Sequence, residues 1–181
     1  MKNRDEFPAL LNAMNLTGTG AEVGVKCGVF SQYLLFHSKL SMLLLIDPWR
    51  HLDGYVDSCN VSDETFEGYL HATKINVGCF EGRYRIMRML SLEAAVLIAD
   101  GTLDFVYLDA DHSYAAVKAD IAAWWPKVRK GGILAGHDYV QGLINNSEFG
   151  VIQAVSEFAK ATGQKVEVTT DSFFPSWWTV K

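Results

Sequence analysis

Acidic and histidine side chains follow two apolar runs of this sequence, residues 103–108 and 132–135, and each run has the length of a buried strand. Between the runs, residues 114–128 carry apolar side chains at helical spacing, so the stretch predicts a strand-helix-strand unit. Parallel strands end at the same edge of a sheet, where open α/β sheets bind ligands. We therefore expect a polar site there, one that could hold a metal. Its candidate residues are Asp109, Asp111, His112, His137 and Asp138.

A glycine-rich turn near the amino terminus is the second chemical signal. Gly24 and Gly28 follow the acid Glu22, which lies in a predicted strand, and they stand at the entrance to a predicted helix. Glycine has no Cβ, so the backbone can approach a ligand closely at such a turn, although a turn also uses glycine for conformation alone. The next predicted strand ends in Asp47, at the interval where nucleotide-binding folds place the acid that binds a ribose.

Strand and helix patterns alternate along the rest of the chain, which predicts an α/β fold with a parallel sheet. Further strands are predicted over residues 21–25, 43–46, 85–90, 165–169 and 177–180. The last two are too close in sequence for a helical crossover, so they should pair antiparallel. Further helices are predicted over residues 5–14, 30–38, 62–74, 91–98 and 150–162, with Ser62 and Ser91 as N-caps. The polar residues 50–60 should form an active-site loop.

Composition and charge argue against several classes of protein. A chain of 181 residues that is 49% hydrophobic predicts a single domain, 1–181, in which residues 1–17 form a short capping helix. The net charge of -5 and the lack of a Lys/Arg run argue against a nucleic-acid partner. No apolar run spans a bilayer and no signal peptide is evident, so we expect no membrane partner and a cytoplasmic location. The three cysteines lack a CxxC spacing and should be reduced.

These motifs resemble those of the class I S-adenosylmethionine-dependent methyltransferases. The segment EVGVKCG, residues 22–28, matches their acid and Gly-x-x-x-Gly pattern, and Asp47 matches their ribose-binding acid. The segments LDADHSY and GGILAGHDY look like those of the metal-dependent small-molecule O-methyltransferases, the macrocin-type enzymes and, more distantly, the catechol type. The resemblance covers almost the whole chain. It implies a Rossmann-like, doubly wound sheet of seven strands in the order 3-2-1-4-5-7-6, mostly parallel with an antiparallel C-terminal strand.

The resemblance also implies a cofactor site for S-adenosylmethionine. Asp47 would accept hydrogen bonds from both ribose hydroxyls, and Trp49 or the backbone near Ser91 would flank the adenine. An aromatic residue after a strand also serves as packing, so Trp49 keeps that alternative. The residues implied for cofactor binding are Glu22, Gly24, Gly28, Asp47, Trp49, Ser91 and Asp109.

In the metal-dependent relatives, an acid after the fourth strand and two adjacent residues after the fifth bind a divalent ion, and these positions match Asp109, His137 and Asp138. The family usually has an acid or an acid-amide pair where this chain has His137 and Asp138. Magnesium prefers oxygen ligands, whereas an imidazole suits manganese, iron, nickel or zinc. If His137 points away instead, Asp109, Asp138 and water would hold magnesium. The acids could also be solvated strand ends or helix caps.

His112 and Asp109 are the implied catalytic residues. His112 lies three residues after Asp109, where macrocin-type enzymes have their general base, and an unperturbed histidine with a pKa of about 6.5 can take a proton near neutral pH. The alternative is a structural hydrogen bond in its turn. The implied reaction is transfer of a methyl group to a small hydroxylated acceptor whose oxygen is activated by Mg or Mn.

Two other functions share these sequence features. An NAD(P)-binding oxidoreductase has the same kind of sheet and an acid at the position of Asp47, but Lys26 stands where its Gly-x-Gly-x-x-Gly fingerprint requires glycine. A non-catalytic protein could bind S-adenosylmethionine without turnover. Only one short helix is predicted before the first strand, where these methyltransferases carry segments that bind the acceptor. We therefore expect the acceptor cleft to be open, or to be completed by a second subunit of a homo-oligomer.

Overall fold

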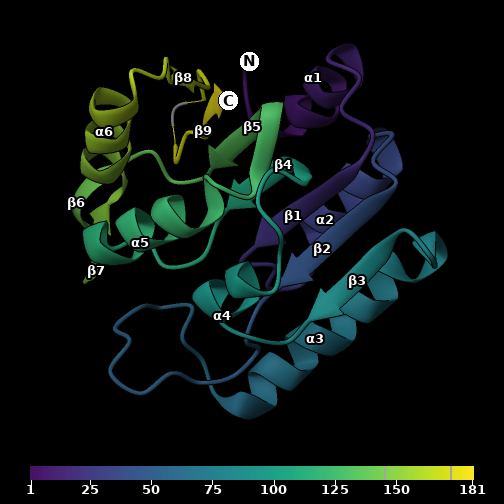
Figure 1. Ribbon diagram of the computed structural model, residues 1–181. Helices are drawn as coiled ribbons and strands as arrows, with labels where there is room; N and C mark the ends of the chain where they lie inside the picture. Colours follow the sequence, from purple (N-terminus) through teal and green to yellow (C-terminus); the bar gives the residue numbers. More distant parts are fainter. Residues whose placement is uncertain (145, 172) are drawn as a thin grey trace.

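Seven strands form one mixed sheet with helices on both faces in the computed structural model of the protein (Figure 1). The structure describes residues 1–144, 146–171 and 173–181. Along the sheet, the strands are β3 (Tyr84–Met87), β2 (Met42–Ile46), β1 (Thr19–Val23), β4 (Leu103–Leu108), β5 (Val128–Gly136), β9 (Trp177–Val180) and β8 (Glu167–Val168). The first five are parallel, and β9 runs antiparallel to both β5 and β8. The predicted fold class and strand order are confirmed.

Helices cover both faces of the sheet, which is why its central strands are apolar on both sides. On one face lie α1 (Phe7–Ala13), which follows the short 3-10 helix η1 (Arg4–Glu6), α2 (Val29–His37) and α3 (Asp63–Val77), which is followed by η2 (Gly78–Phe80). On the other face lie α4 (Ser91–Val96), α5 (Tyr114–Trp124) and α6 (Val151–Thr162). All residues of β4 are buried, because this strand lies at the centre of the sheet under both helical layers.

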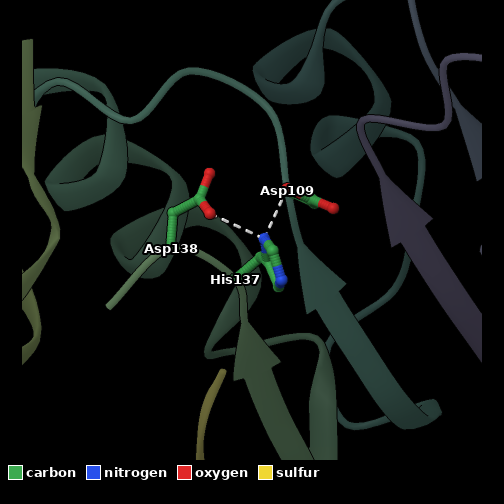
Figure 2. A group of neighbouring side chains, drawn as sticks. All are labelled: Asp109, His137 and Asp138. Atoms are coloured by element: carbon green, nitrogen blue, oxygen red, sulfur yellow. Dashed lines mark ion pairs between the residues drawn. The ribbon is translucent and has the colours of Figure 1, made fainter. Parts of the chain in front are cut away.

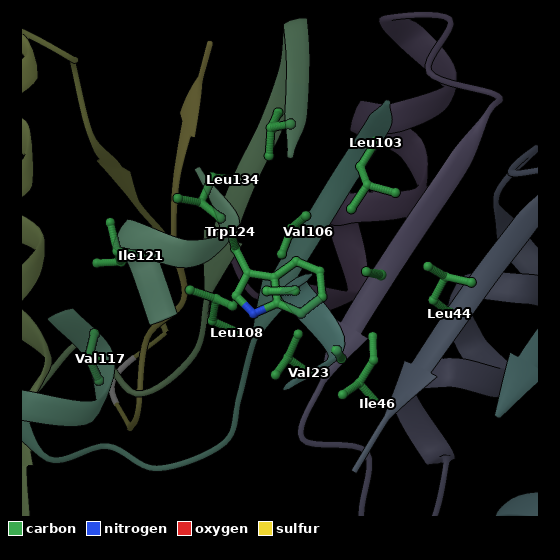
Figure 3. Close-up of a cluster of buried hydrophobic side chains, with 14 of the residues drawn as sticks. Val23, Leu44, Ile46, Leu103, Val106, Leu108, Val117, Ile121, Trp124 and Leu134 are labelled. Carbon is green, nitrogen blue, oxygen red and sulfur yellow. The ribbon is translucent and has the colours of Figure 1, made fainter. Parts of the chain in front are cut away.

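Trp124 lies at the centre of the core between α5 and the sheet (Figure 3). Its side chain is fully buried, among residues of β1 and β4 such as Val23 and Val106. The indole N–H donates to Ser91 Oγ at 2.9 Å, and Ser91 Oγ donates to Asp120 Oδ1 at 2.5 Å. A buried indole N–H needs such a partner, so one contact both satisfies it and joins α4 to α5.

Several predicted boundaries differ from the structure, among them those of β1 and β3, which both begin and end earlier than predicted. Helix α5 ends at Trp124 and β5 begins at Val128, both earlier than predicted. Trp125 keeps helical backbone and donates to Ile121 O, but Pro126 has no N–H group, so it cannot continue the helical hydrogen bonds. Ser62 caps α3 as predicted and accepts from Thr65 N, but Ser91 is the first residue of α4, and the N-cap is Leu90.

A hairpin that the sequence did not predict follows β5. It consists of β6 (Gln141–Ile144) and β7 (Ser147–Gly150), which pair antiparallel. Its sequence is mostly polar and rich in turn residues, a composition typical of loops. The hairpin lies beside α5 and α6 (Figure 1) and leads directly into α6.

No helix in the described ranges is both long enough and apolar enough to cross a membrane. Cys27, Cys59 and Cys79 are all free.

Trp124→Ala should lower the free energy of unfolding by about 3–5 kcal/mol, because it removes a fully buried aromatic side chain and leaves a cavity. Urea denaturation monitored by circular dichroism measures this change. Val96→Ala is the matched control, since Val96 is 81% exposed and its truncation should change stability by less than about 0.5 kcal/mol. Equal stabilities of the two variants would contradict the central position of Trp124 in the core.

Candidate active site

Of the residues predicted at the strand ends, Asp109, His112, His137 and Asp138 converge at one edge of the sheet, and Figure 2 shows three of them. The Asp111 carboxylate instead accepts from Ser113 N at 2.8 Å, in the turn before α5. Asp109 follows β4, and His137 and Asp138 follow β5; one potential ligand atom from each lies within 4.8 Å of the others. His137 Nδ1 lies between the two carboxylates, 2.7 Å from Asp138 Oδ1 and 3.7 Å from Asp109 Oδ1. This set of two carboxylates and an imidazole can bind a divalent transition metal.

Asp138 adopts a backbone conformation that is uncommon outside glycine. Its φ is +52°, in the left-handed region. The turn is held by Val140 N, which donates to Asp138 O at 2.6 Å, and by Tyr139 N, which donates to Pro175 O at 2.8 Å. Strained backbone of this kind persists where the surrounding structure enforces it, and it often occurs at functional sites.

His112 lies against the same two carboxylates. Its Nε2 is 2.8 Å from Asp138 Oδ2 and 3.5 Å from Asp109 Oδ1. The nitrogen is buried, and within the described part of the chain no acceptor is aligned well enough for a hydrogen bond, so these contacts are ion pairs. The ring stacks on Phe149 of the hairpin with an interplanar angle of 11°, and Gly150 N donates to His112 O. The hairpin therefore fixes the position of the imidazole.

The charges of the cluster shift the pKa values of its members. Burial lowers the pKa of His112, but the carboxylates of Asp109 and Asp138 outweigh burial and raise it to about 10. Burial acts to raise the pKa of Asp138, yet His112 and His137 outweigh it and lower that pKa well below its usual range. In this arrangement His112 is a cation at neutral pH, so the expectation of an ordinary pKa near neutrality is wrong.

Packing explains both glycines of the turn between β1 and α2. Gly24 has a φ of +90°, and a Cβ there would lie 2.0 Å from the carbonyl oxygen of Asp109. Gly28 has a φ of +71°, and a Cβ there would lie 2.9 Å from Thr73 Cγ2 of α3. Any side chain at Gly24 would push β1 away from the end of β4. The turn therefore lies directly beside Asp109.

Asp47 is engaged by the backbone of this turn. Its Oδ2 accepts from Val25 N at 3.0 Å and from Lys26 N at 2.9 Å, while Oδ1 accepts from Trp49 N at 2.8 Å. A carboxylate offers about four acceptor positions, so Oδ1 retains one for a ligand hydroxyl. In this conformation Asp47 can bind one ribose hydroxyl; the predicted pair of bonds would require the turn to move.

Glu22 is buried beneath the turn and bound to α2. Ser31 Oγ donates to Glu22 Oε2 at 2.5 Å. Burial raises the pKa of Glu22 to about 8; the bond from Ser31 opposes this, and the charge of Asp109 adds to it. Glu22 is therefore mostly protonated at neutral pH and ties β1 to α2. Its effect on a cofactor would be through the position of the turn.

For Trp49 the structure supports the packing alternative over the predicted contact with adenine. Its side chain is fully buried in the core on the α2 side, and its indole N–H donates to Lys26 O at 2.8 Å. It has no exposed face for an adenine, so packing replaces the predicted cofactor contact. The side chain of Ser91 is likewise engaged between α4 and α5, which leaves only its backbone for a ligand.

The loop at residues 50–60 is organised by one of its own side chains. Asn60 Nδ2 donates to Leu52 O and Tyr55 O, both at 2.8 Å, and Asn60 Oδ1 accepts from Leu52 N. Burial raises the pKa of Tyr55 in this loop, and the charge of Asp111, which follows β4, adds to that rise.

Arg4 is a site residue that the sequence did not indicate. From η1, its Nη1 donates to Asp109 Oδ2 at 3.2 Å, and its guanidinium lies 4.9 Å from the ring centroid of Phe30 in α2. No motif surrounds this arginine, and 105 positions separate it from Asp109. Phe149 was missed for a similar reason, since its segment has no strand pattern.

Comparisons with known proteins agree with this geometry. A family model described as a methyltransferase domain matches residues 21–139. No protein of curated function matches the sequence. An O-methyltransferase from Bacillus cereus, solved in complex with S-adenosylhomocysteine, has a TM-score of 0.66 and 14% identity, over 98% of this chain and 80% of that one. A protein from Corynebacterium glutamicum has a TM-score of 0.67 and 18% identity, over 100% and 82%. At these identities, the neighbours establish the fold.

Glu22→Gln should remove a pH dependence of stability. The folded-state pKa of Glu22 is raised to about 8, above the unfolded value of about 4.3, so between these values the folded chain retains a proton that the unfolded chain loses. The free energy of unfolding of the wild-type protein should therefore fall as the pH rises from about 5 to 8, by at most about 1.4 kcal/mol per pH unit. The variant, whose side chain is always neutral, should lack this part of the pH dependence.

Urea melts of both proteins at several pH values measure this difference. Ser31 Oγ can donate to the amide oxygen of the variant, so the fold should persist. Stability curves that stay parallel across this pH range would show that Glu22 is ionised in the folded protein.

Proposed function

We propose a metal-assisted O-methylation for this chain, which belongs to the methyltransferase-domain family. The enzyme would use S-adenosylmethionine to methylate a hydroxyl group of a small acceptor, with the help of a divalent metal. The observation that carries this proposal is the convergence of Asp109, His112, His137 and Asp138 beside the turn at Gly24. Such a site combines a place for a cofactor with groups that bind and deprotonate an oxygen.

The residues at the ends of β1, β2 and β4 fit S-adenosylmethionine. Asp47 keeps one acceptor position for a ribose hydroxyl, and the backbone near Ser91 would contact the adenine, since the Ser91 side chain is engaged by Asp120. Glu22, Gly24 and Gly28 shape the turn between them. The Bacillus cereus neighbour binds S-adenosylhomocysteine, the product form of this cofactor, on the same fold.

Asp109, His137 and Asp138 fit a divalent metal. They offer two carboxylates and one imidazole at mutual distances suited to one ion, and the nearby buried His112 Nε2 has no aligned partner among the described residues. A metal bound there would lower the pKa of an acceptor hydroxyl. The imidazole of His137 favours manganese, iron, nickel or zinc over magnesium.

His112 is proposed to accept the proton of the acceptor hydroxyl. Its Nε2 faces Asp109 and Asp138, and Phe149 holds the ring in this position. Asp109 and Asp138 keep the imidazole of His112 protonated in the present arrangement. A divalent metal bound to the same two acids would lower the pKa of His112 and free the ring to act as a base.

A small, hydroxylated acceptor suits the charge of the chain better than a nucleic acid. The net charge is -5, and several carboxylates lie at the edge of the sheet where an acceptor would bind. A polyanion would be repelled there. Methyl transfer would then depend mainly on holding the two reactants in line.

Asp109→Ala and Asp47→Ala should separate chemistry from cofactor binding. Asp109→Ala should reduce metal-stimulated methyl transfer on the order of a hundredfold or more while S-adenosylhomocysteine still binds, because it removes a metal ligand. Asp47→Ala should weaken S-adenosylhomocysteine binding about tenfold or more, because it removes the ribose acceptor.

Calorimetric titration with S-adenosylhomocysteine measures the binding. Transfer of a labelled methyl group to a panel of phenols, catechols and sugars measures the activity. Asp100→Ala is the matched control, since Asp100 is exposed and pairs only with Lys127 among the described residues. Normal metal-stimulated turnover by the Asp109→Ala enzyme would refute the metal-assisted reaction.

A thermal-shift panel tests the ligand class. S-adenosylhomocysteine should raise the melting temperature, a softer divalent metal should raise it further, and EDTA should reverse the second effect only. NAD should have no effect. Stabilisation by NAD and not by S-adenosylhomocysteine would favour an oxidoreductase, and indifference to every metal would favour a methyltransferase without metal or a non-catalytic binding protein.

A further inference from the structure

Arg4 is a cation with unused hydrogen-bonding capacity at the edge of the candidate site. Within the described ranges its guanidinium donates to Asp109 Oδ2 and lies beside the Tyr107 hydroxyl, which leaves several of its N–H donors without a protein partner. Arg83 shows the contrasting structural case, since it donates to three backbone carbonyl groups, those of Leu35, Ser38 and Leu40. The side chain of Arg4 is 34% exposed, so a ligand can reach it.

The position of Arg4 relates to α2 as well as to Asp109. Its guanidinium stacks on Phe30, the second residue of that helix. Gly28, the N-cap of α2, provides no side-chain acceptor for the N–H groups of the first turn. A helix beginning attracts negative charge, and a cation beside it strengthens that attraction. Arg4 therefore stands beside the first turn of α2, close to the glycine turn.

The charges nearby show what kind of anion belongs there. Asp47 is an acid that would suit a hydroxyl group of a ligand, and Asp109 is an acid already paired with Arg4. Arg4 forms an ion pair with Asp109 of the candidate site, and no Lys or other Arg of the described residues pairs with an acid of that site. The amino acid portion of S-adenosylmethionine carries both an ammonium and a carboxylate, so its carboxylate needs a cation at this edge.

We infer that Arg4 binds the carboxylate of the cofactor's methionine portion. A nucleoside held at Asp47 and extended across the turn at Gly24 would reach the end of β4, because Gly24 lies against the backbone of Asp109. Arg4 lies on the α2 side of Asp109, between that acid and the ring of Phe30. Asp109 Oδ1 faces the histidines and Oδ2 faces Arg4, so this acid can serve the metal and the arginine with different oxygens. The inference rests on the proposed cofactor.

The test compares two ligands that differ only in the carboxylate, S-adenosylhomocysteine and its decarboxylated analogue, which keeps the amine. Calorimetric titration of the wild-type protein should show tighter binding of S-adenosylhomocysteine. Arg4→Gln should weaken S-adenosylhomocysteine by about tenfold or more and leave the affinity for the analogue unchanged, because a charged hydrogen bond is lost only with the first ligand. Arg4→Lys should recover part of the loss, since it keeps the charge but not the planar donor pair.

Lys2→Gln is the matched control, because it removes a positive charge from the same exposed segment and should change neither affinity. Unchanged binding of S-adenosylhomocysteine by Arg4→Gln would refute the role of Arg4 alone. Equal weakening of both ligands would show that Arg4 supports the fold of the site instead. Failure of the wild-type protein to bind S-adenosylhomocysteine at all would refute the proposed function together with this inference.

Discussion

The crowding of carboxylates at one edge of the sheet is the constraint on which the candidate site depends. Gly24 brings the end of β1 against the backbone of Asp109, and β5 delivers Asp138 to the same place. Carboxylates this close repel one another unless cations compensate them. His112 compensates Asp138 from one side, and Arg4 compensates Asp109 from the other. A divalent metal would be a further compensating charge, placed where a reacting oxygen could also bind.

Compensation also explains why distant parts of the chain meet at this edge. Arg4 comes from the amino-terminal turn, and Phe149, which holds His112 in place, comes from the hairpin after β5. Glu22 needs no compensating cation, because burial keeps its carboxyl group protonated and Ser31 donates a hydrogen bond to it. Protonation removes one negative charge from a region that already holds Asp47 and Asp109.

Sequence patterns predicted the sheet and the convergence of its polar ends because both depend on local periodicity and on parallel strand geometry. Asp109, His137 and Asp138 follow apolar strands, so their meeting required only the strand order. Trp49 failed as a cofactor residue because nothing local shows which way a side chain after a strand turns; here it turns into the core. Arg4 and the hairpin were missed because their roles depend on contacts far along the chain. Ordinary pKa values failed for His112 for the same reason.

A crystal structure of the protein with S-adenosylhomocysteine and Mn²⁺ tests the central claim most directly. An anomalous difference peak should lie among Asp109, His137 and Asp138, about 2.0–2.3 Å from at least two of their ligand atoms, with the nucleoside sugar at Asp47 and the cofactor sulfur facing the metal. A manganese ion bound elsewhere on the protein, or a nucleoside bound away from the turn at Gly24, would contradict the claim that one edge of the sheet holds both reactants.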